Sequence, residues 1–146
     1  MAGLRWVDAL DSAMSETFEG MAFAEVARGV AATASAEPDA QVWACVDVVE
    51  PPFGPLVVVV GRAFAARLEE TITGAEHGDE GGRLDALGEL ANALAGRLAR
   101  RIDPRGERIV LGLPKVGVGA WSGEDALDWV VYVADDRDPI RIGRRR

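Results

Sequence analysis

Hydrophobic residues recur at helical spacing in two long stretches of this chain. In residues 4–26 and again in residues 84–102, apolar side chains return every three or four positions. Because positions about 100° apart return to one face at these steps, each stretch predicts a long amphipathic helix. The same spacing over residues 64–72 predicts a shorter helix, which Gly74 is expected to terminate.

Runs rich in β-branched residues lie between the predicted helices. Residues 41–49 alternate in part, residues 56–60 are continuously apolar, and the proline-rich segment 51–55 between them is typical of a turn. These features predict a hairpin. Three later segments also predict strands, namely 108–119, 128–134 as a strong central strand, and 140–142 as a candidate for a short one. Pro114 implies an edge, a bend or a bulge within the first of them.

The order of the predicted elements repeats along the chain as helix, strand, strand, helix, then helix, strand, strand. Two hairpins can form a mostly antiparallel sheet with long helices packed against it, so we predict a two-layer α+β fold with pseudo-duplicated halves. The long helices share an Asp-Ala-Leu triplet that starts at Asp8 and at Asp85. Aligning the triplets places Ser12 opposite Glu89 and a second serine opposite Asn92. If the halves derive from one repeat, only the second keeps this polar pair.

Length and composition are typical of one soluble domain. With 146 residues, 49% hydrophobic and 27% charged, residues 1–146 can bury a core without disulfides or structural metals. The net charge of -8 argues against nonspecific nucleic-acid binding, which needs accumulated Lys and Arg. Basic residues gather only at the end of the chain, as Arg137, Arg141, Arg144, Arg145 and Arg146. We expect a solubilising, partly frayed terminus there, and favour a partner-docking arm less.

The sequence predicts neither export nor a membrane span. Asp8 and Asp11 interrupt the first amphipathic segment, which therefore lacks the apolar core of a signal peptide. No stretch approaches the roughly 18 apolar residues of a membrane helix. The single cysteine, Cys45, cannot form an internal disulfide. We therefore expect a cytoplasmic protein without membrane association.

Several isolated residues have both a chemical and a structural interpretation. His77 lies near acidic residues, but no second His or Cys stands at ligand spacing, so we favour a solvated loop and predict no metal site. Cys45 is favoured as a small core residue over a nucleophile. The glycines around Gly117 lack the strand-to-helix context of a phosphate-binding loop. The four tryptophans are expected to be core or interface anchors, with Trp121 as the candidate for an exposed, partner-facing side chain.

The second long helix carries a polar stripe opposite its apolar one. Asp85, Glu89, Asn92 and Gly96 recur at steps of four, three and four, which returns to a single face. The core-facing stripe comprises Leu87, Leu90, Ala91, Leu94 and Leu98. The rest of the outer surface is expected to be nearly bare, consisting of Gly88, Ala93, Gly96 and Ala99 with Arg100 near its end. Such a surface suits close approach by a partner, and a solvated helix face is the plain alternative.

The string Asp85-x-x-x-Glu89-x-x-Asn92-x-x-x-Gly96 resembles the signature of the CheC, CheX and FliY family of chemotaxis phosphatases. Residues 88–92 with Gly96 are most similar to CheX. The later run Leu-Gly-Leu-Pro-Lys-Val is similar to the Leu-Pro strand that follows this helix in CheX. The resemblance implies a CheC-like fold and, because the first helix lacks a second Glu-x-x-Asn, one active face per chain.

The resemblance also implies an activity, namely hydrolysis of the aspartyl phosphate on a phosphorylated CheY-type receiver domain. The receiver holds the phosphoryl group and Mg²⁺, so no cofactor is expected in this chain. Asn92 would hold water for in-line attack, since a carboxamide both donates and accepts hydrogen bonds. Glu89 would pair with a lysine of the receiver. Gly96 would permit close approach, and Asp85 would tune the rim or cap the helix start.

Two functional hypotheses of different classes remain open. The first is this phosphatase, acting in bacterial chemotaxis or a related two-component pathway. The second is a noncatalytic adaptor of the same fold that binds a receiver domain or another signalling protein. Similarity to CheX also implies a homodimer formed through strand or sheet edges, which hydrophobic periodicity alone does not establish.

Overall fold

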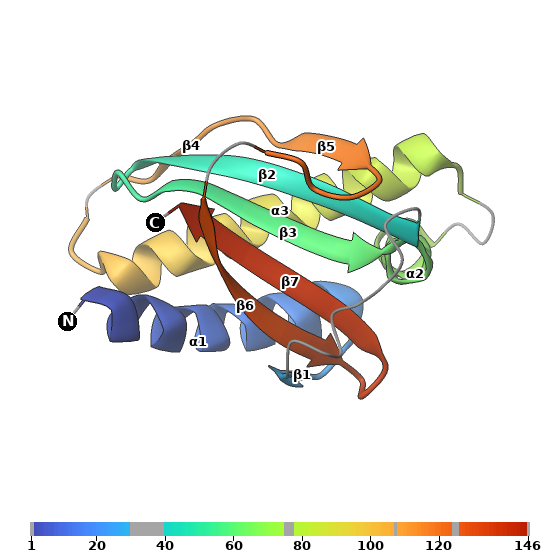
Figure 1. The fold of residues 1–146 in the computed structure, drawn as a ribbon, viewed down its shortest axis with the longest axis horizontal. Helices are drawn as coiled ribbons and strands as arrows, with labels where there is room; N and C mark the ends of the chain where they lie inside the picture. The colour runs from blue at the N-terminus through green and yellow to red at the C-terminus, as the bar shows by residue number, and fades with distance from the viewer. Residues whose placement is uncertain (1, 30–39, 75–77, 107, 124–125, 146) are drawn as a thin grey trace.

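The protein has two layers, a seven-stranded sheet and helices packed on one of its faces (Figure 1). The computed structural model describes residues 2–29, 40–74, 78–106, 108–123 and 126–145, with side chains from residue 6 onward. All described strand pairs are antiparallel. The predicted fold class, an antiparallel sheet with long helices packed against it, is therefore confirmed.

The three predicted helices are present with shifted ends, as α1 Ala2–Ala22, α2 Arg62–Thr73 and α3 Glu80–Ile102. Helix α1 stops before residue 26 because Phe23 adopts a positive φ of 49° and the chain then enters a strand. Helix α3 starts earlier than predicted because Asp79 caps it, its carboxylate accepting a hydrogen bond from the Gly82 amide at 2.8 Å. Gly74 ends α2 in the left-handed region, as predicted.

The strands are β1 Val26–Arg28, β2 Gln41–Glu50, β3 Gly54–Gly61, β4 Val110–Leu111, β5 Lys115–Val118, β6 Leu127–Ala134 and β7 Asp138–Arg145. Their order in the sheet is β1-β6-β7-β3-β2-β4, and β5 also pairs with β2. The predicted hairpin β2–β3 is confirmed, and β6–β7 forms a second one. The two hairpins join through β3 and β7 into one continuous sheet.

The predicted strand over 108–119 is divided in two around Pro114. Strand β4 pairs Leu111 with Val48 of β2, whereas β5 pairs Lys115 with Cys45 of the same strand. The bend predicted from the proline is therefore present. It carries the chain between β4 and β5 along α3, against which both strands pack.

The C-terminal segment differs most from its prediction. Instead of a frayed terminus, the last described residues form β7, which lies between β6 and β3 (Figure 1). Ile140 and Ile142 are fully buried beneath the helices. The guanidinium of Arg141 lies 4.8 Å from the Trp129 ring centroid, on which it stacks. The alternating residues Ile140 and Ile142 thus form the buried face of β7. The many arginines around them led to the prediction of a solvated terminus instead.

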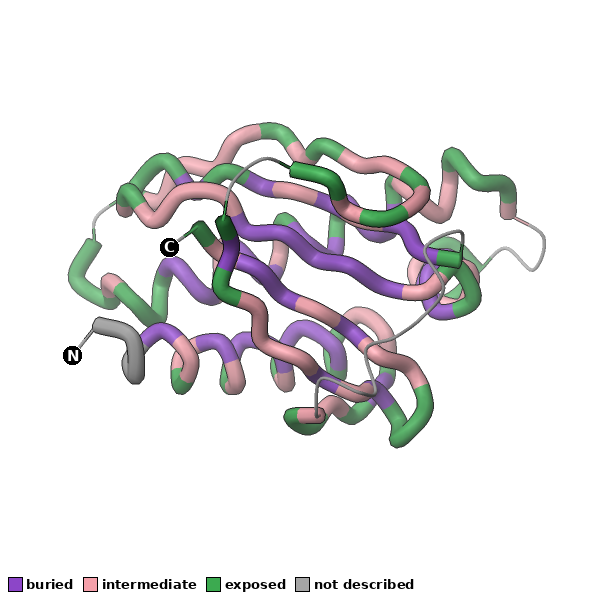
Figure 2. The backbone as a smooth tube through the Cα atoms, in the orientation of Figure 1, coloured by how far each residue is buried: buried purple, intermediate pink, exposed green. Residues whose placement is uncertain are grey.

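Helices α1 and α3 pack against each other on the sheet and supply nearly half of the main buried cluster. The predicted core stripe of α3 is buried, as Leu87, Leu90, Ala91, Leu94 and Leu98. Figure 2 shows buried positions running along the central strands and exposed ones at the turns. Leu10 and Leu87, the last residues of the two Asp-Ala-Leu triplets, are both fully buried, while Asp8 and Asp85 are both exposed, which agrees with the proposed repeat.

The opposite face of the sheet carries a smaller apolar cluster around Val57 and Val59. Trp43 and Trp121 meet there edge to face with ring centroids 4.8 Å apart, and Cys45 packs against the same cluster. Trp121 is therefore half-buried rather than freely exposed. Across the described residues, no helix combines the length and apolar character that crossing a membrane requires.

Candidate functional site

The polar stripe of α3 points out of the protein, as predicted. Asp85, Glu89 and Asn92 are exposed and Gly96 is half-buried. Glu89 and Asn92 stand three residues apart, about 4.5 Å along the axis and close to the same azimuth. Within the described parts of the chain, the side chains of these two residues have no hydrogen bond or ion pair. A carboxylate and a carboxamide are therefore presented together with their bonding capacity unused.

The bare surface predicted around the stripe is narrower than expected. Gly88 and Ala99, both assigned to the outer face, are buried. Gly88 is covered by the chain between β4 and β5, such that a Cβ there would lie 3.4 Å from side-chain atoms of Pro114 and Val116. Asp85 also lies well inside α3, because the helix begins at Glu80. The prediction that it caps the helix start is therefore wrong, and its place at the rim of the stripe remains.

The stripe forms one wall of a groove of about 830 Å³. Helix α3 contributes Asp85, Glu89, Asn92, Gly96 and Arg100 to this candidate groove. The opposite wall is the chain from Ile109 to Val116, which includes β4 and the bend. The backbone of this wall is tied to β2 through the Gly112 amide, which donates to the Asp47 carbonyl at 2.8 Å. The groove thus joins the two segments whose sequences resemble CheX.

Gly96 differs from Gly88 in what surrounds it. A Cβ on Gly96 would meet only Leu111 Cδ1, at 3.9 Å, which is an ordinary van der Waals contact. The protein's own packing therefore does not require glycine at this position. Glycine in a helix interior costs roughly 0.5–1 kcal/mol relative to alanine. The missing side chain leaves space on this face, and close approach by a partner there stays a prediction.

Leu113 is a candidate contact residue that sequence reasoning missed. It lies at the bend between β4 and β5, lines the candidate groove and is 90% exposed. Periodicity assigned this segment to a strand, in which an apolar residue is expected to pack inward. Its position immediately before Pro114 was the available signal, because the residue preceding a proline at a bend has no neighbouring strand to cover it.

Helix α3 is held rigidly behind the groove. Arg97 donates to the buried Thr17 hydroxyl of α1 at 3.0 Å. Arg101 of α3 forms an ion pair with Glu16, which also belongs to α1. Together with the buried leucines, these contacts fix the rotation of α3, which keeps Glu89 and Asn92 at the surface.

The polar groups of the described groove suit positioning and hydrogen bonding. Its described lining contains no Ser, Thr, Cys, His, Tyr or Lys side chain. Its polar groups are the carboxylates of Asp85 and Glu89, the Asn92 carboxamide and the Arg100 guanidinium. Among the described residues no group of His, Cys, Asp or Glu could hold a metal ion, and His77 lies outside them. Such a site can bind a partner and orient water.

No protein-family model and no curated protein sequence matches the chain. Solved structures do match it. The chemotaxis protein CheX from Vibrio vulnificus is 15% identical with a TM-score of 0.68, and the match covers 94% of this chain and 95% of that one. A chain of the CheX-CheY-BeF3-Mg²⁺ complex from Borrelia burgdorferi is 12% identical with a TM-score of 0.65, covering 96% of each chain.

A third match is a chain of the FliM-SpeE complex from H. pylori, at 12% identity and a TM-score of 0.68 over 96% of this chain and 84% of that one. All three matches span nearly the whole of this chain. At these identities the likeness concerns the fold. The protein therefore has the CheC-like fold found in CheX.

Proposed function

We propose that this protein is a CheX-like member of the CheC, CheX and FliY family and accelerates hydrolysis of the aspartyl phosphate on a CheY-type receiver domain. The observation that carries the proposal is the pair Glu89 and Asn92, exposed and without partners within the described chain, on the wall of the candidate groove. A chain of the same fold in the structure of a CheX-CheY complex supports a receiver domain as the partner.

The chemistry divides between the two proteins. The receiver supplies the phosphorylated aspartate and Mg²⁺, which neutralises charge on the phosphoryl oxygens. Water attacks the phosphorus in line, the bond between phosphorus and the aspartyl oxygen breaks, and inorganic phosphate leaves with the carboxylate restored. Asn92 holds that water, because its carboxamide oxygen accepts a hydrogen bond from the water while its NH₂ group donates one to a phosphoryl oxygen. Positioning of this kind lowers the entropic part of the barrier.

Glu89 orients the docked receiver. Its carboxylate pairs with a lysine of the receiver in a charge-assisted contact. Because Glu89 lies one helical turn before Asn92, this contact fixes the position of the carboxamide relative to the phosphorus. Loss of Glu89 should therefore weaken docking more than it slows the bound complex.

The shape of the groove supports docking by an element that approaches α3 closely. Gly96 leaves the floor of the groove open, and Leu113 projects from the opposite wall. An exposed leucine beside a polar pair provides the apolar contact that most protein interfaces contain.

We also place the reaction in the cytoplasm, where a half-buried thiol such as Cys45 remains reduced.

The test measures the decay of a phosphorylated receiver domain from the same organism, with and without this protein. We expect the wild type to accelerate decay and Asn92→Ala to remove the acceleration. Ser15→Ala is the matched control, since the repeat alignment places Ser15 opposite Asn92 on α1. Acceleration by Asn92→Ala equal to that of the wild type would refute the proposed mechanism.

The noncatalytic adaptor is the second candidate. A chain of this fold also occurs in a FliM-SpeE complex, so proteins of this architecture are found with partners other than CheY. An adaptor would bind the phosphorylated receiver without changing its rate of decay. Binding measured by calorimetry together with an unchanged decay rate would select this function over the phosphatase.

A further inference from the structure

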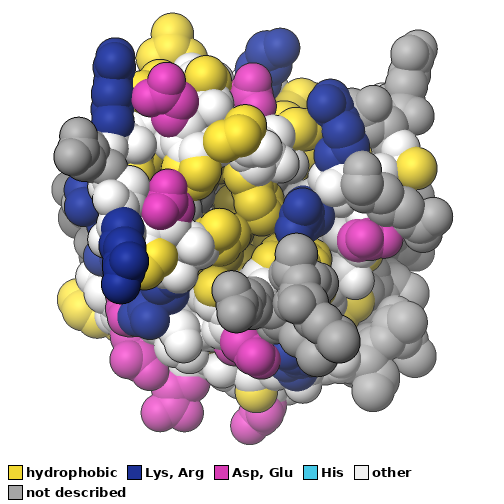
Figure 3. All heavy atoms as spheres, turned by 90° about the vertical axis from the view of Figure 1, so that its left-hand side faces the viewer, with side chains coloured by type: hydrophobic (Ala, Val, Ile, Leu, Met, Phe, Trp, Pro, Cys, Tyr) yellow, Lys and Arg dark blue, Asp and Glu magenta, His cyan; other side chains and the backbone are white. Residues whose placement is uncertain are grey.

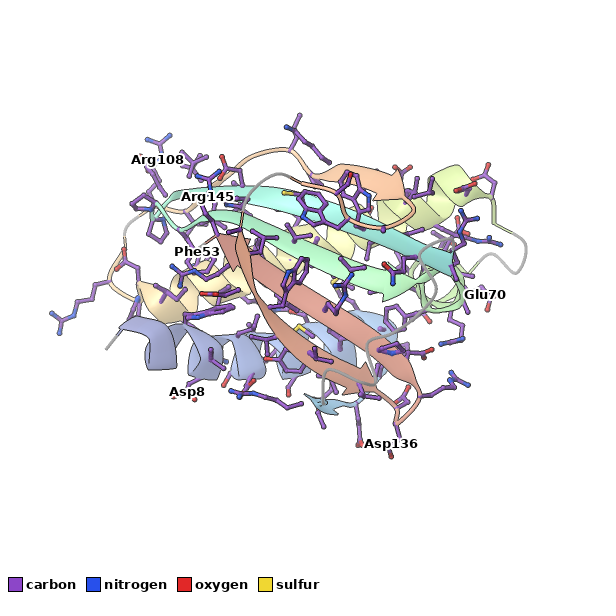
Figure 4. The ribbon with its side chains drawn as sticks, in the orientation of Figure 1. Asp8, Phe53, Glu70, Arg108, Asp136 and Arg145 are labelled. Carbon is purple, nitrogen blue, oxygen red and sulfur yellow. The ribbon has the colours of Figure 1, made fainter. Side chains whose placement is uncertain are left out.

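A second concavity opens at the end of the molecule where α3 terminates. It has a volume of about 1120 Å³, and we call it the end hollow. Figure 3 shows this end, with hydrophobic side chains in the central hollow and both basic and acidic side chains around it. Its apolar lining includes Trp6 of α1, Phe53 of the β2–β3 turn and Ile102 of α3. Figure 4 shows Phe53 and Arg145 together at this end.

The most unusual group in the end hollow is Arg144 of β7. Its guanidinium carbon lies 4.3 Å from the Phe53 ring centroid and 5.2 Å from that of Trp6. The Nε–H of the same side chain is buried and has no hydrogen-bond acceptor within the described structure. A buried donor without an acceptor destabilises the folded state, because it has lost its bond to water. The side chain is therefore held by two rings while part of its bonding capacity is unused.

The charge of the lining is opposite to that of the whole chain. Three arginines, Arg100, Arg101 and Arg144, line the end hollow together with a single carboxylate, Asp8. Arg101 pairs with Glu16. Neither Arg100 nor Arg144 pairs with any carboxylate of the described chain. In a protein of net charge -8, this local excess of positive charge favours an anionic occupant.

We propose that the end hollow binds a small molecule that carries a carboxylate or phosphate group on an apolar body. Arg144 binds the anionic group, because a guanidinium held flat presents its N–H groups in the geometry of a carboxylate or phosphate. Trp6, Phe53 and Ile102 contact the apolar body. The volume of about 1120 Å³ lies slightly above the roughly 300–1,000 Å³ usual for small-molecule sites, so it can hold such a ligand.

The end hollow adjoins the candidate groove but contains neither Glu89 nor Asn92, the residues of the proposed phosphatase chemistry. Ser12, which lines the end hollow, is the residue that the repeat alignment places opposite Glu89. The end hollow therefore lies beside the part of α1 that corresponds, in the repeat alignment, to the part of α3 that carries Glu89 and Asn92. In α1 these positions hold serines. Arg100 lines both the end hollow and the candidate groove, so it is left unchanged in the test.

The test uses the fluorescent probe 1-anilinonaphthalene-8-sulfonate, an anion on an aromatic body, titrated into the purified protein. We expect saturable binding that Arg144→Met weakens at least tenfold, because methionine keeps apolar contact and removes the charge. Arg137→Met is the matched control, since Arg137 is an exposed arginine in the turn between β6 and β7, away from the end hollow. Equal weakening by both variants, or by neither, would overturn the proposal.

A second variant guards against misfolding of Arg144→Met. Ser12→Trp fills the end hollow from an exposed position on α1, and Glu19→Trp adds the same ring to an exposed position outside it. Thermal melts of all variants establish that they fold. We expect Ser12→Trp to abolish probe binding and Glu19→Trp to leave it unchanged. Retained probe binding in a folded Ser12→Trp variant would contradict the proposal.

Displacement of the probe distinguishes the two sources of the anion. Guanosine monophosphate represents an aromatic phosphate and decanoate an aliphatic carboxylate. We expect at least one of them to displace the probe at a concentration tenfold or more below that needed by its neutral analogue, guanosine or decanol. Equal displacement by charged and neutral compounds, or no displacement by either anion at 10 mM, would refute an anion site.

Discussion

The Asn92 side chain makes no hydrogen bond with any described residue of the protein. Asparagine costs a few tenths of a kcal/mol relative to alanine in a helix interior. Its neighbours in α3 are mostly residues that favour helices, and its carboxamide has no partner among the described residues. The Glu89 carboxylate likewise has no partner among the described residues. These two polar groups, one helical turn apart and exposed, are therefore available for contacts with another molecule.

Replacing Gly96 is expected to have opposite effects on folding stability and on docking of the receiver. Replacing Gly96 by alanine should raise the free energy of unfolding by roughly 0.5–1 kcal/mol, because the helix gains propensity and the added Cβ meets only Leu111 at 3.9 Å. The same Cβ should raise the half-saturating concentration for the phosphorylated receiver. Urea denaturation and the receiver decay assay measure the two effects.

Gly20→Ala is the matched control for Gly96→Ala. Gly20 also lies within a helix, is exposed, and would place its Cβ in open space. We expect it to stabilise the protein to a similar degree and to leave the receiver assay unchanged. If both alanine variants leave docking unaffected, Gly96 is not needed for close approach.

At the scale of elements, the bend between β4 and β5 forms the second half of the proposed docking surface. Leu113→Ala should raise the half-saturating receiver concentration about five- to tenfold, because it removes an apolar contact worth on the order of 1 kcal/mol. The maximal decay rate should stay within twofold of the wild type, since Leu113 holds no water. Folding stability should also stay near the wild type, since the side chain is 90% exposed.

Phe23→Ala tests whether any exposed apolar side chain has this effect. Phe23 is 81% exposed at the end of α1 and does not line the candidate groove. It should leave both kinetic constants unchanged. An unchanged half-saturating concentration for Leu113→Ala would remove the bend from the docking surface while leaving the role of Asn92 intact.

A polar network ties α1 to the edge of the sheet. Arg28 of β1 donates two hydrogen bonds to the Asp11 carboxylate, at 2.9 and 2.8 Å, and the Tyr132 hydroxyl of β6 donates a third at 2.5 Å. Burial acts to raise the pKa of Asp11, but the bonds from Arg28 and Tyr132 outweigh it and leave the pKa below its ordinary value of 3.8. Burial and the Asp11 carboxylate raise the pKa of Tyr132.

The network predicts a specific loss of stability in acid. Because the pKa of Asp11 is lower in the folded protein, its contribution is present above pH 3.8 and is lost as pH falls through the folded value. Asp11→Asn should therefore destabilise the protein by about 1 kcal/mol at pH 6, a figure reduced for the partial exposure of the pair. The difference from the wild type should shrink at pH 3. Urea midpoints at the two pH values measure it, and an equal difference at both would contradict this role.

Elements with strong periodicity could be predicted from the sequence, and elements that depend on pairing could not. Helix α3 and the β2–β3 hairpin have regular apolar patterns. Strand β1 is only three residues long and exists because β6 pairs with it. The length of strand β7 was underestimated because its segment is rich in arginine, as a solvated tail would be. Composition does not reveal that Arg141 and Arg144 stack on aromatic rings.

The candidate site was predictable only in part for a similar reason. Helical geometry placed Glu89 and Asn92 on one outer face without tertiary information. The opposite wall of the groove, with Leu113 at its edge, depends on how β4 and β5 pair with β2. The same pairing buries Gly88, which helical geometry alone had left exposed. Contacts between segments of low periodicity therefore determine the parts of the site that the sequence did not reveal.

At the scale of the whole molecule, we propose a homodimer. The sheet ends at β1 on one side and at β4 and β5 on the other, so unpaired strand edges are present within the described fold. Light scattering at micromolar concentration should give twice the chain mass of 15.5 kDa. Elution as a monomer at 100 µM would count against a dimer without affecting the proposed activity of each chain.

The central claim is that Asn92 accelerates the chemical step and Glu89 secures docking. The most direct measurement is the rate of receiver dephosphorylation as a function of receiver concentration for the wild type, Asn92→Ala and Glu89→Ala. We predict that Asn92→Ala lowers the maximal rate about 100-fold with a half-saturating concentration within threefold of the wild type, and that Glu89→Ala chiefly raises that concentration. An Asn92→Ala variant that retains the wild-type maximal rate would contradict the account.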